Sequence, residues 1–398
     1  MTKFLLPLLL TGLLIVTSCV EETNPEFDQK SFTKIYDNNL FTTNYFPIDM
    51  AQTPDGGYLI LGGRRLADSN FTGIYLMKAD KEGNFVKEIE VDNNVVNPIA
   101  QLAAFNNSYY FFCMDPLTLQ VQLAQTDADL EAVSFTAAAG DLYYPCAAGI
   151  DGNNFVLLSY DHLTKQSVIA VVNASGAVSQ SKAFTIGAGD KVEEPIINHF
   201  IRTGRQYPFD AGRIPGGLFY FNGFYNYTFS LVFTDLSQND PRGVVQGIQD
   251  DGGFSAIQPL STTKFAGARF NFGDNYLLPN VNLNPTGISS SVDLGGNTLP
   301  ELEPNAKVRI LRATINSKNV LVYGSNTRSK QIGLYFYDEA NGTFLSSKYL
   351  GFSNPFEISQ VISTEDGGLA VCGTTYLAGR FPRICLIKID AKDITGLQ

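Results

Sequence analysis

Short hydrophobic runs separated by turn-forming residues dominate the chain. Runs such as residues 155–158, 219–221 and 320–323 are rich in aromatic and β-branched residues, which favour strands. Gly, Asn and Asp recur between the runs, and these residues suit tight turns because they tolerate positive φ or cap the turn with a side chain. Beyond the N-terminal leader, no segment shows a sustained 3.6-residue period with helix caps. The pattern predicts an all-β fold.

The hydrophobic runs belong to an internal repeat. One unit, residues 48–91, contains four segments with strand character, with the turns 53–57 and 80–83 between them. The last unit repeats this order, with the turn 365–368, an apolar run to Gly373, and a second run that ends in Lys388. Each unit is therefore expected to form four antiparallel strands.

Two landmarks recur in every unit, in more or less degraded form. One is a small or polar residue before the second strand, and the other is the Asp or Asn that opens the second turn. The pairs are Gly57 and Asp80, Ser108 and Asp127, Asn154 and Asn173, Gly217 and Asp235, Gly253 and Asp274, Asn319 and Asp338, and Gly368 and Asp390. The members of each pair lie 18 to 23 residues apart. Seven repeats of a four-stranded unit predict a seven-bladed β-propeller, in which radial packing protects the sheet edges.

Three details follow from this frame. The last unit has only three strands, so residues 32–36 are predicted to pair as the outer strand of the final blade. The fourth unit is expected to have a short or missing outer strand. Two insertions, 199–216 and 277–307, interrupt the period, and the second is polar enough to be a lid or an ordered surface loop and not core.

The propeller is expected to occupy residues 31–398 as a single domain. It resembles the loose Asp-Gly-Gly-Tyr type of propeller common in bacterial surface proteins.

The N-terminus carries a secretion signal. Lys3 precedes an apolar stretch, residues 4–16, which is shorter than the ~20 residues of a membrane-spanning helix. The ending Val-Thr-Ser-Cys19 resembles a bacterial lipobox, so residues 1–18 are expected to be a lipoprotein signal peptide and Cys19 the lipidated (palmitate-bearing) first residue of the mature chain. The acidic tether, residues 19–30, resembles the surface-export signal of Bacteroidota lipoproteins. This resemblance implies an outer-membrane lipoprotein that faces the cell surface, with the periplasmic leaflet as the alternative.

Charge and composition exclude some classes of function. The 398 residues include 28 Lys and Arg against 39 Asp and Glu, a formal net charge of −11. A generic nucleic-acid binder would carry net positive charge or a basic stripe, so no nucleic-acid partner is expected.

Residues typical of reactive sites are few. Two histidines, His162 and His199, lie in different units, so a metal site is not expected. No motif for phosphate binding, a dinucleotide or nucleophilic catalysis is present, and the sequence indicates no cofactor and no nameable catalytic residue. Cys372 and Cys385 flank the hairpin loop of the last unit and are predicted either to form a disulfide or to be two buried thiols. Cys113 and Cys146 are expected in the core.

Basic residues concentrate in loops that join second to third strands. In a propeller these loops gather at one mouth of the central channel, so a basic mouth is predicted within an acidic chain. The candidate ligand-binding residues are Arg64, Arg65, Lys165, Arg328, Lys330, Tyr376 and Arg380, with His162, Lys264, Tyr225 and Phe265 nearby. Charge beside aromatic rings suits an acidic or sugar-bearing ligand. The alternative is that these residues are solvated loop positions.

The leading hypothesis is a lipid-anchored, non-catalytic binding or scaffold module of the envelope, an accessory to an outer-membrane uptake or assembly system. Its expected partners are the membrane, through the lipid, and a protein or glycan. The alternatives are a glycan hydrolase or lyase with its site at the channel mouth, and a purely structural envelope protein. Two carboxylates ~5–10 Å apart in a deep pocket would favour the hydrolase.

Overall fold

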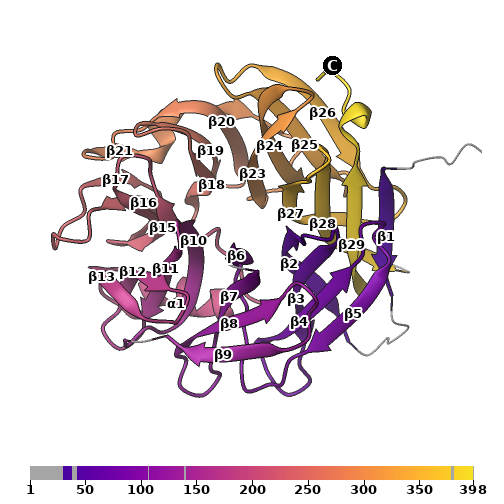
Figure 1. The fold of residues 1–398 in the computed structure, drawn as a ribbon. Coiled ribbons are helices and arrows are strands. Elements are labelled where there is room, and N and C mark those ends of the chain that lie inside the picture. The colour runs from indigo at the N-terminus through magenta and orange to yellow at the C-terminus, as the bar shows by residue number, and fades with distance from the viewer. Residues whose placement is uncertain (1–29, 38–42, 106, 139, 378–380, 398) are drawn as a thin grey trace, which may run out of the picture.

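Each repeat forms one antiparallel sheet, and seven such sheets surround a central channel (Figure 1). The computed structural model describes residues 30–37, 43–105, 107–138, 140–377 and 381–397. The predicted seven-bladed β-propeller is therefore confirmed. The segments assigned to the signal peptide and to most of the tether, Cys19 included, lie outside the described residues.

The blades follow one another in chain order, each from its inner to its outer strand. Blade 1 comprises β2 (Tyr45–Gln52), β3 (Tyr58–Arg65), β4 (Thr72–Ala79) and β5 (Phe85–Glu90). Blade 2 comprises β6 (Ala103–Phe105), β7 (Ser108–Met114), β8 (Val121–Asp127) and β9 (Val133–Ala137). Blade 3 comprises β10 (Pro145–Asp151), β11 (Asn154–Asp161), β12 (Gln166–Asn173) and β13 (Val178–Thr185). Blades 4 and 5 comprise β14 (Asp210–Arg213), β15 (Phe219–Tyr225), β16 (Thr228–Thr234) and β17 (Gly243–Gln246); and β18 (Gly252–Pro259), β19 (Lys264–Asn271), β20 (Asp274–Asn282) and β22 (Asn297–Thr298). Blades 6 and 7 comprise β23 (Val308–Ile315), β24 (Lys318–Asn326), β25 (Ile332–Asp338) and β26 (Phe344–Leu350); and β27 (Phe356–Ser363), β28 (Leu369–Leu377), β29 (Phe381–Ile389) and β1 (Phe32–Tyr36).

The middle strands are apolar throughout because both faces of each blade are covered. Phe111 and Phe112 are adjacent in β7 and therefore point to opposite faces. Phe111 packs with Leu59 of blade 1, whereas Phe112 packs with Leu157 of blade 3. Within the described residues, the buried side chains form seven hydrophobic clusters, one between each pair of neighbouring blades. Each fully buried aromatic or aliphatic side chain stabilises the ring by roughly 1.5–3 kcal/mol.

The chain closes the ring as predicted. β1 pairs antiparallel with β29 as the outer strand of blade 7, in a register that places Phe32 opposite Lys388. The side chain of Arg383 in β29 is buried and reaches forward to the end of β1, where its Nε donates to Asp37 Oδ1 at 2.8 Å. The first and last segments of the propeller are thus joined by a strand and by an ion pair.

The fourth blade is irregular, as expected, and the second insertion completes two blades. The outer strand β17 is only four residues long, and β21 (Ile288–Ser290) pairs with it in parallel. The same insertion supplies β22, which pairs with β20 as the outer strand of blade 5, and the 3₁₀ turn η1 (Ser291–Leu294). Most of the insertion is an ordered surface loop. Leu283 and Leu302 are exceptions to the predicted polar surface, because both are buried between blades.

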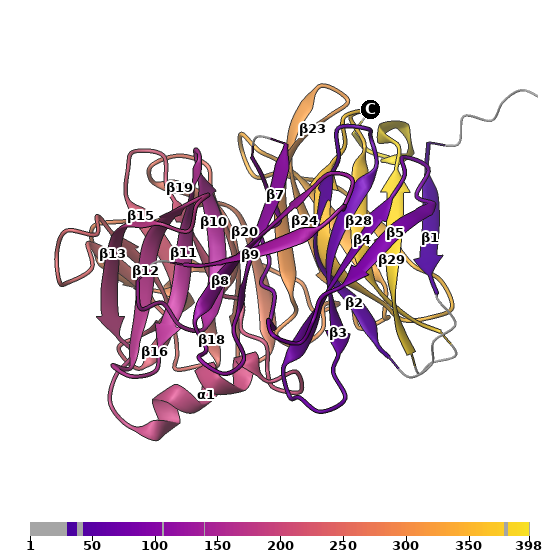
Figure 2. The same cartoon turned by 60° about the horizontal axis from the view of Figure 1, so that its bottom comes forward.

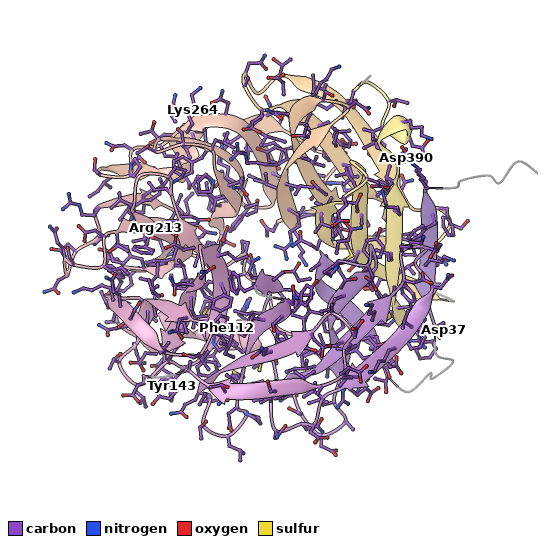
Figure 3. The ribbon with its side chains drawn as sticks, viewed as in Figure 1. Asp37, Phe112, Tyr143, Arg213, Lys264 and Asp390 are labelled. Atoms are coloured by element: carbon purple, nitrogen blue, oxygen red, sulfur yellow. The ribbon has the colours of Figure 1, made fainter. Side chains whose placement is uncertain are left out.

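In the fifth unit the predicted strand frame is wrong. Gly253, assigned to the position before the second strand, lies in the inner strand β18, and Asp274 begins the third strand. Gly253 is small because of a close approach between blades, since a Cβ there would lie 2.7 Å from the carbonyl oxygen of Phe229. Lys264 therefore begins β19 at the end of the ring opposite the predicted basic mouth, and Figure 3 shows it at the outer rim. Phe265 is buried between blades 4 and 5.

The all-β fold contains an α-helix, in a segment where the sequence shows no sustained helical period. α1 (Asp190–Phe200) lies across one end of the ring (Figure 2). It begins after Gly189 without a side-chain cap and contains Pro195, so the helix signals of its sequence are weak. Packing of Ile196 and Phe200 into the cluster between blades 3 and 4 holds it in place. A short 3₁₀ turn, η2 (Ala391–Asp393), follows β29. Within the described ranges, no helix has the length and apolar character needed to cross a bilayer.

Candidate functional site

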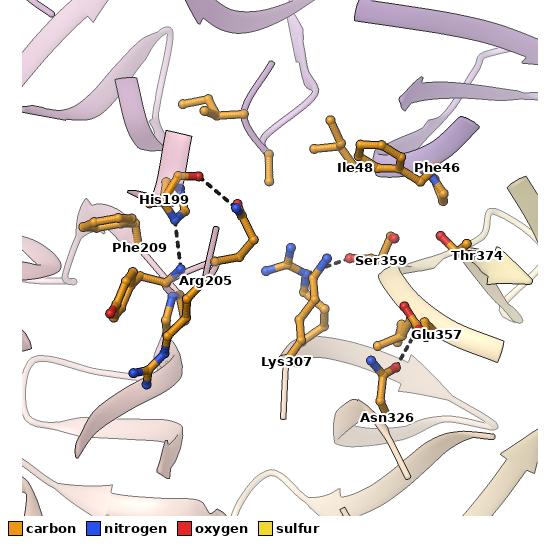
Figure 4. A pocket seen from close by; sticks show the side chains of 18 of the residues that line it. Phe46, Ile48, His199, Arg205, Phe209, Lys307, Asn326, Glu357, Ser359 and Thr374 are labelled. Carbon is orange, nitrogen blue, oxygen red and sulfur yellow. Dashed lines mark hydrogen bonds between the residues drawn. The ribbon is translucent and has the colours of Figure 1, made fainter. Parts of the chain in front are cut away.

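A cavity of about 760 Å³ opens at the end of the channel where the inner strands begin. Residues from the start of β2, from the loop before β6 and from the ends of β19 and β28 form its wall. Loops between second and third strands open on this same face because the strands of each blade alternate in direction. The cavity is thus at the mouth for which the sequence predicts basic residues. Figure 4 shows side chains of its lining.

A segment formed by α1 and the following loop, residues 190–209, crosses this face, and we call it the strap. Arg202 N donates to the Asn70 carbonyl at 2.8 Å, and Asn97 Nδ2 donates to the Phe200 carbonyl at 2.9 Å. These contacts tie the strap to blade 1 and to the connection between blades 1 and 2. On the other side, Tyr207 Oη donates to Asp250 Oδ2 at 2.9 Å, just before blade 5. The strap therefore forms a fixed wall of the cavity.

His199 organises the strap from inside. Its Nδ1 accepts a hydrogen bond of 2.8 Å from the backbone N–H of Tyr207, and its ring packs against Phe200 and Phe209. Burial lowers the pKa of His199 to about 4, so the imidazole is neutral at physiological pH. His199 supports the backbone turn and adds no charge to the cavity.

The charged side chains of the cavity are mainly cationic. Among the described lining residues, four are Arg or Lys and one is a carboxylate: Arg202, Arg205, Lys307, Arg309 and Glu357. Arg205 is neutralised by ion pairs with Asp250 and Asp251, at 3.4 and 3.5 Å, and stacks on Tyr207. Glu357 accepts a hydrogen bond of 3.2 Å from Tyr376 Oη. The remaining cations, Arg202, Lys307 and Arg309, give the cavity an excess of positive charge.

Lys307 and Arg309 lie close to each other inside the channel. Lys307 directly precedes β23, and Arg309 is the second residue of that strand. Arg309 Nε donates to the Ser359 carbonyl at 2.8 Å. Solvent reaches the Lys307 side chain through the mouth, although protein surrounds it in the channel. Burial, reinforced by the charge of Arg309, lowers the pKa of Lys307 to about 7. The lysine therefore changes its charge near neutral pH.

Two aspartates lie near Arg309. Asp49 in β2 is buried and accepts hydrogen bonds from the backbone N–H groups of Gln101 and Leu102 and from Gln360 Nε2, which connects blades 1, 2 and 7. Asp210 in β14 is surrounded by protein, and this burial raises its pKa to about 7, against the opposing influence of Arg309. Neither carboxylate forms an ion pair with Lys307 in the part of the chain that the structure describes.

Of the predicted ligand-binding residues, Tyr376 lines the cavity. Burial raises its pKa to about 12. The other described ones lie on the same face but outside the cavity lining, and most are engaged elsewhere. Arg64 donates hydrogen bonds to the Val91 carbonyl and to Asn93, and Arg328 donates to the Leu302 carbonyl. Lys165 forms ion pairs with Asp190 and Glu193 of the strap, and Lys330 forms one with Glu303. Arg65 is exposed. Arg380 lies outside the described residues, His162 packs against Tyr143 and Tyr144, and Tyr225 packs against Phe184.

The sequence reasoning missed the cations that line the cavity. Arg202 and Arg205 lie in the first insertion, and Lys307 ends the second. Each is adjacent to an irregular segment and not to a recognisable hairpin loop. The available signal was their position in or at the end of an insertion, in the segment that leads into the inner strand β14 or β23.

The four described cysteines are free and buried. The predicted disulfide between Cys372 and Cys385 is wrong, because the register pairs Cys372 with Leu386 and Cys385 with Gly373. The two side chains therefore point to opposite faces of blade 7, where they pack into different clusters. The alternative, two buried thiols, describes them. Burial raises the pKa of Cys385 to about 12, so it is an unreactive thiol. Cys113 and Cys146 are buried in the clusters of blades 1–2 and 3–4, as expected.

Within the described ranges, no group of three or more His, Cys, Asp or Glu side chains could hold a metal ion. Fold and cavity together define the class: a seven-bladed β-propeller with a strap-walled, cationic cavity at one mouth of its channel.

No known family profile and no curated protein matches the chain. Among solved structures, it is similar to a protein of unknown function from Bacteroides caccae, with 14% identity, 84% of this chain and 90% of the other covered, and a TM-score of 0.38. It is also similar to the Dos1 propeller, with 9% identity, coverage of 90% and 95%, and a TM-score of 0.48. A third similarity is to the acylaminoacyl peptidase of Pyrococcus horikoshii, with 10% identity, coverage of 89% and 53%, and a TM-score of 0.46. Similarities of this size say nothing about what the chain binds.

Proposed function

We propose that this chain is a non-catalytic binding module of the bacterial envelope whose ligand occupies the strap-walled cavity. The observation that carries the proposal is the composition of the cavity: an excess of Arg and Lys around a space of about 760 Å³, with Glu357 as the one carboxylate of the described lining. A space of this size is typical of small-molecule sites.

The same composition bears on the hydrolase and lyase alternatives. Glycoside hydrolysis normally needs two carboxylates that flank the scissile bond, and Glu357 has no second carboxylate beside it in the described lining. A lyase that used tyrosine as a base would need a lowered phenol pKa. Burial raises the pKa of both Tyr376 and Tyr207. The cavity is thus better suited to holding a ligand than to transforming it.

The place of the module in the cell is the second part of the proposal. A lipid on Cys19 would hold the propeller at the outer membrane, most simply on the cell surface, and residues 19–30 would act as the tether. From there the module would serve as an accessory subunit of an uptake or assembly system, with an envelope protein as partner.

Two measurements test these parts separately. Labelled palmitate should be incorporated into the chain, and Cys19→Ser should abolish incorporation; labelling that survives the substitution contradicts the anchor. For the cavity, Ala100→Trp fills the space from a lining loop, with Leu117→Trp, an exposed position outside the lining, as the matched control. Native protein purified from membranes should retain its ligand or partner in the control and lose it in Ala100→Trp. Equal retention by both variants contradicts a function of the cavity.

A further inference from the structure

Several polar groups of the cavity lining have no partner among the described residues. The Lys307 Nζ, which solvent reaches through the mouth, makes no hydrogen bond or ion pair with any described residue. Ser255 of β18 lies in the cavity wall and is 6% exposed, and its buried hydroxyl oxygen is without a partner, as is the buried Nε of Arg202. Arg309 uses only Nε, on Ser359, and its two terminal nitrogens make no further hydrogen bond to the described residues. Ser255 and Arg309 belong to the neighbouring inner strands of blades 5 and 6.

Native structures contain few buried polar atoms without a partner, such as the Ser255 hydroxyl and the Arg202 Nε. Lys307 and Arg309 are open to solvent, so a ligand in the cavity can reach their charges. Lys307 and Arg309 repel each other. Of the nearby carboxylates, Asp49 accepts from backbone N–H groups and Gln360, and Glu357 accepts from Tyr376, whereas burial raises the pKa of Asp210 to about 7 and so reduces the charge that it can offer Arg309. A ligand that brings an anionic group would pair with Lys307 and with the open terminal nitrogens of Arg309.

The rest of the lining indicates what carries the anion. Side-chain amides and hydroxyls with open hydrogen-bonding positions face the cavity, among them Asn326 and Thr374. The Asn326 Oδ1 atom accepts from the Ile358 N–H, which leaves its Nδ2 free to donate. The rings of Phe46 and Phe209 lie at the rim, on opposite sides of Lys307 (Figure 4). Scattered neutral polar groups beside aromatic faces suit a body that has many hydroxyls and an apolar ring face.

We infer that the cavity binds an acidic sugar, a uronic acid or an oligosaccharide that contains one, with its carboxylate against Lys307 and Arg309. This inference rests on the proposed function, because it takes the cavity to be the ligand site. The sugar hydroxyls meet the amide and hydroxyl side chains, and the aromatic rings cover the apolar ring face. A carboxylate held by two cations gains charge-assisted hydrogen bonds, which are about twice as strong as neutral ones.

The test is calorimetric titration of the full-length protein in detergent with a matched pair of probes. Trigalacturonate carries the carboxylates, and its methyl ester has the same ring and hydroxyls without the charge. The acid should bind at least about tenfold more tightly than the ester, since a hydrogen bond to a charged group is worth about 1.5–3 kcal/mol. Inorganic phosphate and an acidic hexapeptide are titrated in parallel.

Three variants localise the effect. Lys307→Met should remove most of the preference for the acid over the ester, and Arg309→Met should reduce it by a smaller factor, about threefold. Lys264→Met removes an exposed lysine at the other end of the ring and should leave both affinities unchanged. Thermal melts of each variant show whether it has folded, so that loss of affinity is read only from folded protein.

The outcomes separate the inference from the proposed function. Equal binding of acid and ester, or a preference that survives Lys307→Met, overturns the acidic-sugar inference, whereas loss of that binding in Ala100→Trp still supports a ligand in the cavity. Binding of the peptide or of phosphate that depends on Lys307, without binding of the sugar acid, also overturns the inference. If no probe binds, and Ala100→Trp retains whatever the native protein carries, then the proposed function itself is contradicted.

Discussion

Lys78 Nζ donates a hydrogen bond of 2.7 Å to Asp55 Oδ2, joining the third strand of blade 1 to the turn between its first and second strands. The same turn carboxylate accepts from the Thr53 hydroxyl and from the Gly57 N–H. Blade 7 repeats the arrangement, with Lys388 Nζ at 2.9 Å from Asp366 Oδ1. The Asp-Gly-Gly signature of the sequence is therefore half of a contact whose other half is the lysine that ends the third strand.

Replacing this lysine should destabilise the propeller. Lys78 is almost fully buried, and its removal leaves Asp55 without its main partner and takes a partner from Asp129 as well. Lys78→Met should lower the free energy of unfolding by about 1–3 kcal/mol, because hydrogen bonds to charged groups are worth that much. Urea titration followed by fluorescence measures the change. Lys81→Met, at an exposed lysine of the neighbouring turn, is the control and should stay within about 0.5 kcal/mol of wild type.

The same contact predicts how stability depends on acid. The hydrogen bond from Lys78 lowers the pKa of Asp55 to about 2, below its ordinary value of 3.8. The unfolded chain therefore binds a proton at a higher pH than the folded chain does, so the stabilisation is complete above about pH 4 and is lost as the pH falls toward 2. Unfolding free energies measured from pH 6 to pH 2 should decrease, and Asp55→Asn should flatten part of that decrease. A variant curve parallel to that of wild type would rule out this contribution.

Ring closure offers a separate test. The Arg383 guanidinium is buried and donates to Asp37 and to the Thr43 carbonyl, which joins the last strand of the chain to the segments on either side of the connection from β1 to β2. Arg383→Met should cost about 2 kcal/mol, because Asp37 loses a charged partner while solvent still reaches it. Chemical denaturation should show this loss. Hydrogen exchange should show it too, as faster exchange of β1 than of blade 3. Uniform exchange in the variant would contradict a local role in closure.

The fold was predictable to the extent that it depends on local chemistry. Turn residues such as Asp55 and Asp390 cap their own turns, and β1 could be assigned because the last unit lacked a strand. The strands of blade 5 were placed wrongly because its glycines, such as Gly253, allow a close contact between neighbouring blades and do not mark a turn. The helix α1 was not predicted because it has no capping side chain and contains a proline, and it is stabilised by the tertiary packing of Phe200.

The cavity was less predictable because its position depends on contacts distant in sequence. Loop residues such as Arg64 and Lys165 reach the correct face, but nearby carboxylates and carbonyls take up their charge. Lys307 has no carboxylate or carbonyl partner among the described residues, and the neighbouring sequence does not distinguish it from a solvated lysine. Arg309 is two residues further on, and it is the return of the second insertion into β23 that places both side chains in the channel.

Lys307 should carry a cost in stability that its proposed role explains. Its pKa of about 7 in the folded protein lies below the ordinary lysine value of 10.5, because burial and Arg309 disfavour the charged form; Asp49 and Glu357 act in the opposite sense, as does Cys372. Between pH 7 and 10.5 the unfolded chain therefore binds more protons than the folded chain, so this group makes stability rise with pH across that window.

Lys307→Met removes this penalty, so near pH 7 the variant should melt at a higher temperature than wild type while it loses the preference for the sugar acid. Because the Lys307 side chain is open to solvent through the mouth, screening reduces this penalty, and the gain should be small, on the order of 1 °C. A gain of stability coupled to a loss of binding is typical of residues retained for function. In wild type, affinity for the acid should fall as the pH rises through about 7, because the anion favours protonated Lys307. Calorimetry in buffers of different ionisation enthalpy should detect proton uptake on binding, and an affinity that is constant from pH 6 to 8.5 would show that Lys307 does not face the anion.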